Sequence, residues 1–194
     1  MSQLYHVELK GSVTETIHLH DEIVHQLDLS HILGEDDMKS LLRKQLEAND
    51  FQKDEEEDVW RKSMEDGVEV VFNLEDMQVS ARLEEAQDVE KDVSAVGSAW
   101  DHKGQAKKAA EQELEHQKDR ARQEIQRQSN EQQRELSQQL EAGEEERMLE
   151  INQMLQEVYA EALKEKAQSM GDVMEVHEGT SANGDYELVI KISQ

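Results

Sequence analysis

The chain of 194 residues contains no cysteine and no proline, and only 4% of its residues are aromatic. Without cysteine it can form no disulfide, thiolate nucleophile or zinc–thiolate site, and it suits a reducing compartment. A domain of this length with average usage would hold about ten prolines. Their complete absence is typical of a chain dominated by helix, because a proline inside a helix costs about 3 kcal/mol.

Long hydrophobic runs are also missing. No segment approaches the roughly eighteen consecutive apolar residues that a membrane-spanning helix requires. The first residues lack the basic region and the apolar run of a signal peptide. The sequence therefore predicts a cytoplasmic protein without membrane insertion.

Basic residues are scarce as well. The chain has 21 Lys and Arg against 46 Asp and Glu, a net charge of −25, and residues 1–100 alone hold 25 acidic against 9 basic residues, a net −16. Repulsion at this density argues against nucleic acids and anionic membranes as partners. Basic protein surfaces or cations are the expected partners.

The first hundred residues carry a strand pattern interrupted by one short helix. Residues 3–29 alternate between apolar and polar side chains, with breaks at Gly11 and Asp21, which predicts three antiparallel strands in a meander. Acidic residues 35–37 followed by an apolar stripe to Leu46 predict a helix. Further strands are expected at 59–60, 68–74 and 77–83, and the weaker pattern of 84–100 indicates an extended strand or a linker.

A long charged helix is expected from residue 101 to 171. Five apolar residues repeat in it at eleven-residue intervals, in two series: Leu114, Ile125 and Leu136, then Leu140 and Ile151. An eleven-residue repeat favours a nearly straight, coiled-coil-like seam, and we take these five residues as candidates for partner binding, including a homodimer through the long helix. Gly143 leaves two alternatives open, namely a continuous helix and an antiparallel helical hairpin that turns there.

The C-terminal part should be a helix with a wide apolar face over 148–163, followed by a hairpin. Residues 173–178 and 186–193 are the expected strands, and Asn183–Gly184 is a strong turn signal. The predicted fold class is therefore α+β, in three regions. These are a β-rich domain (1–100), a long charged helix (101–147), and a helix with a β-hairpin (148–194).

Two stretches carry a family resemblance. They are the opening Tyr5-His-Val-Glu-Leu-Lys-Gly-Ser-Val-Thr-Glu-Thr and the pair formed by Leu155–Lys166 and Gly184–Ile192. Together they resemble the small accessory proteins of bacterial ternary systems built on an FtsH-type AAA+ protease and a von Willebrand factor A protein. The resemblance implies an adaptor or scaffold beside an ATPase, and it supplies no catalytic residues.

Candidate chemistry is sparse. His18 and His20 lie two apart on one predicted strand and so share a face, where a carboxylate such as Glu15 or Glu22 would complete a metal site. The simpler interpretation, which we favour, is an exposed polar strand face. The acidic run from Asp54 to Asp58 lacks the spacing of an EF-hand loop and reads as a solvated loop.

No catalytic motif accompanies these residues. The sequence has no glycine-rich phosphate loop, no nucleophile elbow and no paired-histidine zinc motif. Trp60 and Trp100 are expected to be packing anchors, and no cofactor is expected. The sequence favours a non-enzymatic scaffold or adaptor, with an AAA+ ATPase system among the expected partners. The alternative is a metal- or ligand-binding regulatory protein that uses the His18/His20 face.

Overall fold

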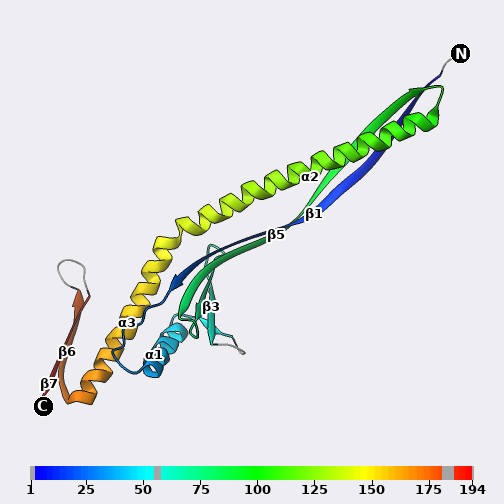
Figure 1. The fold of residues 1–194 in the computed structure, drawn as a ribbon. Coiled ribbons are helices and arrows are strands. Elements are labelled where there is room, and N and C mark those ends of the chain that lie inside the picture. The colour runs from blue at the N-terminus through cyan, green and yellow to red at the C-terminus, as the bar shows by residue number, and fades with distance from the viewer. Residues whose placement is uncertain (1–2, 55–57, 181–185, 194) are drawn as a thin grey trace. The chain divides into compact units, whose positions relative to one another are not determined.

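The computed structural model describes residues 3–54, 58–180 and 186–193 (Figure 1). It is a mixed α+β fold, as the sequence predicts. The elements in chain order are β1 (Leu4–Gln26), α1 (Glu35–Ala48), β2 (Gln52–Lys53), β3 (Val59–Ser63), β4 (Glu69–Asn73), β5 (Gln78–Trp100), α2 (Lys103–Ala142), α3 (Glu144–Met170), β6 (Asp172–Thr180) and β7 (Tyr186–Ser193). Five strands form one sheet in the order β1-β5-β4-β3-β2, and β6 pairs with β7. No helix in the described residues is long and apolar enough to cross a membrane.

The predicted meander of three strands over residues 3–29 is wrong, because β1 is one strand of 23 residues. Its partner β5 is equally long. Contacts between them pair Gln3 with Asp101, Thr16 with Asp88, and His20 with Glu84, so the two strands run antiparallel in a constant register. The segment 84–100, left open as strand or linker, is therefore strand. The alternation of buried and exposed side chains continues through Gly11 without a turn. A glycine can occupy a position inside a paired strand, so its presence does not by itself mark a turn.

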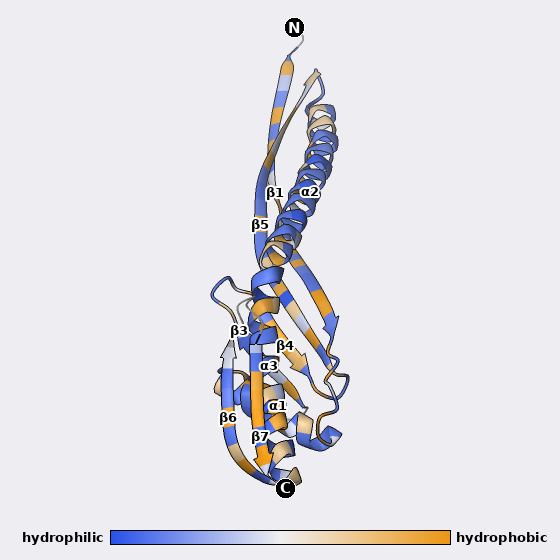
Figure 2. Ribbon diagram, turned by 90° about the vertical axis from the view of Figure 1, so that its left-hand side faces the viewer, coloured by the Kyte–Doolittle hydropathy of each residue, from blue (hydrophilic) through white to orange (hydrophobic). Residues whose placement is uncertain are grey.

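The chain divides into two compact units. The first comprises the residues up to Asp21 together with Leu83–Gln139, and so contains most of β1, β5 and α2. Odd-numbered residues of both strands face α2, and the buried ones include Val13, Ile17 and Ala95. Figure 2 shows that α2 is mainly hydrophilic, which fits a helix that buries only a narrow stripe.

β5 and α2 come into direct backbone contact at Gly97. A Cβ atom placed on this glycine would lie 2.0 Å from the Ala106 carbonyl oxygen and 2.4 Å from the Ala110 nitrogen. Both alanines are fully buried. Small residues on the strand and on the helix therefore let the two backbones touch, and this contact sets the spacing between the layers at this end of the first unit.

The second unit comprises Glu22–Arg82 and Leu140–Gln194. Its sheet strands β3 and β4 pair antiparallel, and α1 packs against α3. Its core is formed by large, fully buried apolar side chains: Met38, Leu42, Leu46, Val68, Phe72, Leu74, Val79 and Val158. Phe51 meets Phe72 edge to face, with ring centroids 5.2 Å apart. The predicted short helix and the strands at 59–60, 68–74 and 77–83 all take part in this core.

The long helix is interrupted at one residue. α2 ends at Ala142 and α3 begins at Glu144, and Gly143 between them keeps right-handed backbone angles of φ −89° and ψ 0°. The Arg147 N–H donates to the Gly143 carbonyl at 3.1 Å, so the next helical turn starts at once. An antiparallel helical hairpin needs a connecting loop of 2–5 residues. The folded-back alternative is therefore wrong, and the helical path is continuous apart from Gly143.

The C-terminal hairpin has the predicted strands. β6 and β7 pair antiparallel, for example Val173 with Ile192 and Val176 with Ile190, and the register shifts between Val173 and Glu175. Both strands contact α3. The predicted Asn183–Gly184 turn lies outside the described residues.

Candidate functional site

His18 and His20 lie on one exposed face of β1, as the spacing predicts. The Nδ1 atom of His20 is 3.3 Å from Oε1 of Glu84 on β5. His6 and His25 lie on β1 as well. Over residues 3–54, 58–180 and 186–193, no three His, Asp or Glu side chains are grouped so as to hold a metal ion. The metal site at His18 and His20 stays an alternative hypothesis beside the favoured interpretation of an exposed polar strand face.

The eleven-residue seam is largely buried within the single chain. Ile125, Leu136, Leu140 and Ile151 are all buried, and Leu114 is half-buried. In the first unit the seam faces the strands, since Leu114 lies beside Gly11 of β1 together with Val93 of β5. Leu114, Ile125 and Leu136 thus mark the stripe of α2 that packs on its own strands, and Ile125 and Leu136 are buried within the single chain.

The ends of the acidic run are tied into ion pairs. Both Asp58 carboxylate oxygens accept from the Arg43 Nε at 3.2 Å, and the Trp60 indole N–H donates to Asp58 at 3.4 Å. The hydrogen bonds from Arg43 hold the pKa of the Asp58 carboxyl below its usual value. Asp54 lies 3.6 Å from Arg61. Residues 55–57 lie outside the described part of the chain. Asp58 therefore serves as a structural anchor between α1 and β3.

The two tryptophans behave differently. Trp60 is buried in the sheet at 2% exposure, which confirms it as a packing anchor. The same prediction is wrong for Trp100, which is 62% exposed at the end of β5. Trp100 occupies an even-numbered position, on the face of the strand that α2 does not cover. Alternation alone did not show which of the two faces would be covered.

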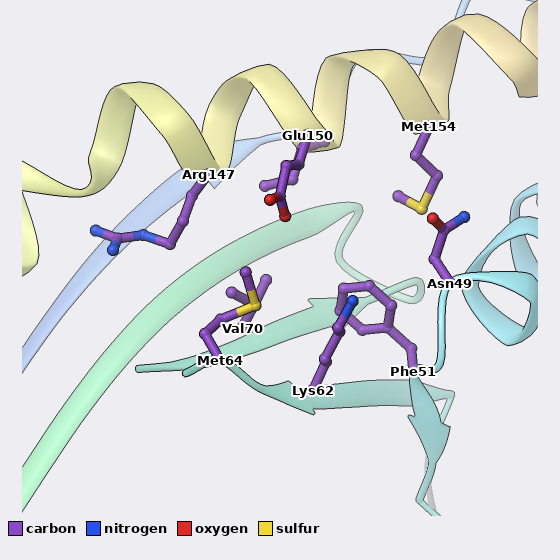
Figure 3. Close-up of a pocket in the computed structure, with 9 residues that line it drawn as sticks. Asn49, Phe51, Lys62, Met64, Val70, Arg147, Glu150 and Met154 are labelled. Carbon is purple, nitrogen blue, oxygen red and sulfur yellow. The ribbon is translucent and has the colours of Figure 1, made fainter. Parts of the chain in front are cut away.

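The apolar face of α3 is mostly intramolecular core. Ile151, Met154 and Val158 are buried, whereas Leu149 and Leu163 stay exposed. Beneath this face lies a small cavity between α3, β3 and β4 (Figure 3). It is lined by Asn49, Phe51, Lys62, Met64, Val70, Arg147, Glu150, Ile151 and Met154. Its polar lining residues are Asn49, Lys62, Arg147 and Glu150, and the other lining residues are apolar.

Arg147 is a buried charged residue of this region that the sequence pattern does not reveal. Its side chain is only 6% exposed, and it donates to the Leu140 carbonyl and to Asp66, the latter at 3.3 Å. It thereby satisfies a carbonyl at the end of α2, where helices leave such groups without partners. The sequence offers one signal for this role. Arg147 is a single basic residue directly after the acids 144–146, and it lies one helical turn before the buried Ile151.

The β6–β7 hairpin exposes apolar side chains on an element with little cover. Met174 is 72% exposed, and Val176, Tyr186 and Val189 are also exposed. None of the described side chains in the two strands is fully buried, and only one face, including Leu188, Ile190 and Ile192, is half-buried. Two-stranded hairpins are marginally stable alone in water. Exposed apolar side chains on such an element are typical of an interaction surface.

Comparison with known protein families decides the identity. A family model described as FtsH ternary system domain X5 matches residues 1–193. The chain belongs to this family. No curated protein and no solved structure matched the chain significantly.

The X5 match covers far more than the two stretches on which the resemblance rested. Tyr5–Thr16 lies within β1, and Leu155–Lys166 lies within α3, so these stretches are parts of the structural framework of the X5 domain. The description assigns the family to an FtsH-associated ternary system, which fits protein partners. It names no ligand and no reaction.

Proposed function

We propose that this X5 domain is a non-enzymatic adaptor or scaffold that joins protein partners within an FtsH-associated ternary system. The exposed apolar side chains of the β6–β7 hairpin carry the proposal. The hairpin presents Met174, Val176 and Val189 to solvent, and none of its described side chains is fully buried. The family description supports a role beside other components of such a system. The proposal includes an AAA+ ATPase as partner and a cytoplasmic location, since a chain without cysteine suits a reducing compartment.

A homodimer through the long helix is not part of this proposal. Ile125 and Leu136 are buried against the chain's own strands, so dimerisation through them would first require α2 to leave the sheet. The charge also favours a different partner, because two copies would each bring a net charge of −25. We therefore place partner binding on surfaces that the single chain leaves exposed.

Co-purification with the AAA+ ATPase of the same system tests the proposal. Met174→Ser combined with Val189→Ser removes exposed apolar surface from the hairpin and should reduce the recovered ATPase at least tenfold. Val96→Ser is the matched control, because Val96 is similarly exposed at 61% but lies on β5, and it should leave recovery unchanged. Failure of the unaltered chain to bind the ATPase would contradict the proposal, as would equal recovery with the hairpin variant.

A further inference from the structure

One edge of β5 has no partner strand over most of its length. β4 pairs with β5 only from Gln78 to Arg82. From Leu83 to Trp100, no other strand in the described part of the chain lies on that side, while β1 occupies the opposite side. An unpaired edge of this length is a template for an additional strand, and proteins normally protect such edges.

The contacts of His20 show which backbone groups point to the open edge. His20 and Glu84 lie opposite each other in the antiparallel pair. The His20 N–H and C=O point away from β5, because the Gln133 side-chain amide binds both, at 3.4 and 3.0 Å. In an antiparallel ladder, two opposite residues form either a hydrogen-bonded pair or a non-hydrogen-bonded pair. In the first kind both residues direct their N–H and C=O groups toward the partner strand, and in the second kind both direct them away from it. The backbone groups of Glu84, and by alternation those of Asp88 and Glu90, therefore face the open edge of β5.

The two edges of this strand pair are thus unequal. On the β1 edge, Gln133 occupies the place that a peptide group of a neighbouring strand would take. On the β5 edge, no side chain in the described part of the chain hydrogen-bonds to the outward-facing backbone groups of residues 83–100. At the level of His20 and Glu84, an added strand is therefore better accommodated beside β5 than beside β1.

A groove runs along this edge between β5 and α2. Val89 and Lys91 line it from the strand, and Gln128, Glu131 and Glu135 line it from the helix. Lys91 is already engaged with Glu124 at 2.9 Å. Glu131 and Glu135 are exposed, and neither is ion-paired within the described residues. The groove thus offers two carboxylates to the side chains of an incoming strand.

The opposite face of β5 is acidic as well. Asp88 accepts from the Thr16 hydroxyl at 2.7 Å, and Glu90 and Asp92 are exposed beside it. Residues 83–100 contain five acidic residues and one lysine. A second copy of this edge would bring the same charge, so pairing between two copies is disfavoured. A basic strand would meet carboxylates on both of its faces.

We propose that the open edge of β5, over about residues 84–92, binds an extended lysine- or arginine-rich segment of a partner protein by strand addition. The backbone of the segment pairs with Glu84, Asp88 and Glu90, and its basic side chains on the helix side reach Glu131 and Glu135. Backbone pairing supplies affinity in this mode, and alternate side chains supply specificity. The inference rests on the proposed adaptor function and names the kind of partner segment.

A synthetic nine-residue peptide of alternating lysine and threonine is the probe. With the full chain at low salt, Glu131→Lys with Glu135→Lys should weaken its binding at least tenfold in titration calorimetry. Glu111→Lys with Glu141→Lys gives the same change in net charge outside the groove and is the matched control, with less than a threefold effect expected. A peptide with glutamate in place of lysine, and one with a central proline, should not bind measurably.

Amide hydrogen exchange separates strand addition from unspecific attraction. Binding should slow exchange at Glu84, Asp88 and Glu90 at least fivefold. Binding without this protection, equal loss in both double variants, or dimerisation through this edge in light scattering would overturn the inference. If the peptide gives none of this protection while the unaltered chain still co-purifies the ATPase, the inference fails and the adaptor function stands; if the unaltered chain binds no ATPase, the adaptor function itself fails.

Discussion

At the scale of single residues, Gly97 has the tightest surroundings of the described glycines in the first unit. Its missing side chain lets β5 touch the backbone of α2, so that a Cβ would meet backbone atoms at 2.0 and 2.4 Å. Gly97→Ala should therefore destabilise the fold by about 1–3 kcal/mol, as overpacking does. Gly104→Ala is the control, because nothing lies within 4 Å of a Cβ there and alanine favours the helix. Chemical denaturation compares them, and equal stabilities would contradict the close contact.

Arg147 supports the second unit through two polar contacts from a buried position. Arg147→Met keeps much of the side-chain volume but leaves the Leu140 carbonyl without its donor, and it also removes the ion pair with Asp66. We expect a loss of about 2 kcal/mol in the free energy of unfolding, because an unsatisfied buried acceptor costs about 1–3 kcal/mol. Arg122→Met on the exposed side of α2 is the control and should change stability by less than about 0.5 kcal/mol. An effect of Arg147→Met as small as this would mean that water satisfies Leu140.

Asp58 should make stability depend on pH. Its pKa is lowered in the folded chain by hydrogen bonds from Arg43, so its stabilising contribution is present above the pKa of the unfolded chain, about 3.9. The contribution is lost as the pH falls through the lower folded value. Asp58→Asn should cost about 1–2 kcal/mol at pH 7, a modest figure because the Arg43 side chain is partly exposed. Denaturation from pH 7 to 3 should show this difference shrinking below about pH 4, and a constant difference would refute it.

At the scale of elements, the sequence predicts which residues share a face better than where a strand ends. Alternation correctly identified the apolar face of β1, yet Gly11 and Asp21 were read as turns, because a glycine fits either a turn or a paired strand. What keeps β1 in one piece is its pairing with β5, whose contacting residues lie 52 to 98 positions away in sequence. The alternation of apolar and polar residues is weak over 84–100, because one face of β5 is acidic and open to solvent. The sequence therefore did not identify this segment as the partner strand of β1.

The same limit applies to the long helix. The eleven-residue spacing of Leu114, Ile125 and Leu136 predicted an apolar seam, and the structure has that seam. Periodicity gives the stripe but not its partner, and a helix packed on two strands leaves much the same pattern as a helix in a coiled coil. The burial of Arg147 was beyond prediction for a related reason, because its acceptor is a backbone carbonyl that any sequence would supply.

The seam itself gives a prediction at this scale. Ile125 is 1% exposed, whereas Leu114 is half-buried near the Gly11 end of the strands. Ile125→Ala should cost about 2–5 kcal/mol, as for other buried aliphatic side chains, and Leu114→Ala should cost clearly less. Thermal unfolding followed by circular dichroism measures both changes. Equal small losses would mean that α2 does not pack on the strands in solution.

At the scale of the whole molecule, charge limits the kind of partner more than shape does. The net charge of −25 is spread over exposed residues of both units, and the open β5 edge and its groove carry carboxylates. Apolar side chains, in contrast, are exposed on the β6–β7 hairpin. With one acidic and one apolar surface, the proposed adaptor can engage two chemically different segments.

These two surfaces should respond differently to salt. Screening shortens the range of electrostatic attraction from about 10 Å at 0.1 M salt to about 3 Å at 1 M, while burial of apolar surface is not weakened by it. Binding of the lysine–threonine peptide should therefore fall at least tenfold between 0.05 and 0.5 M sodium chloride. Over the same salt range, the affinity for the ATPase, which depends on Met174 and Val189, should fall by a smaller factor. The ATPase affinity that remains in the double variant Met174→Ser, Val189→Ser should depend more strongly on salt than that of the unaltered chain. Calorimetric titrations at several salt concentrations measure this, and salt-independent peptide binding would show that charge does not select the partner.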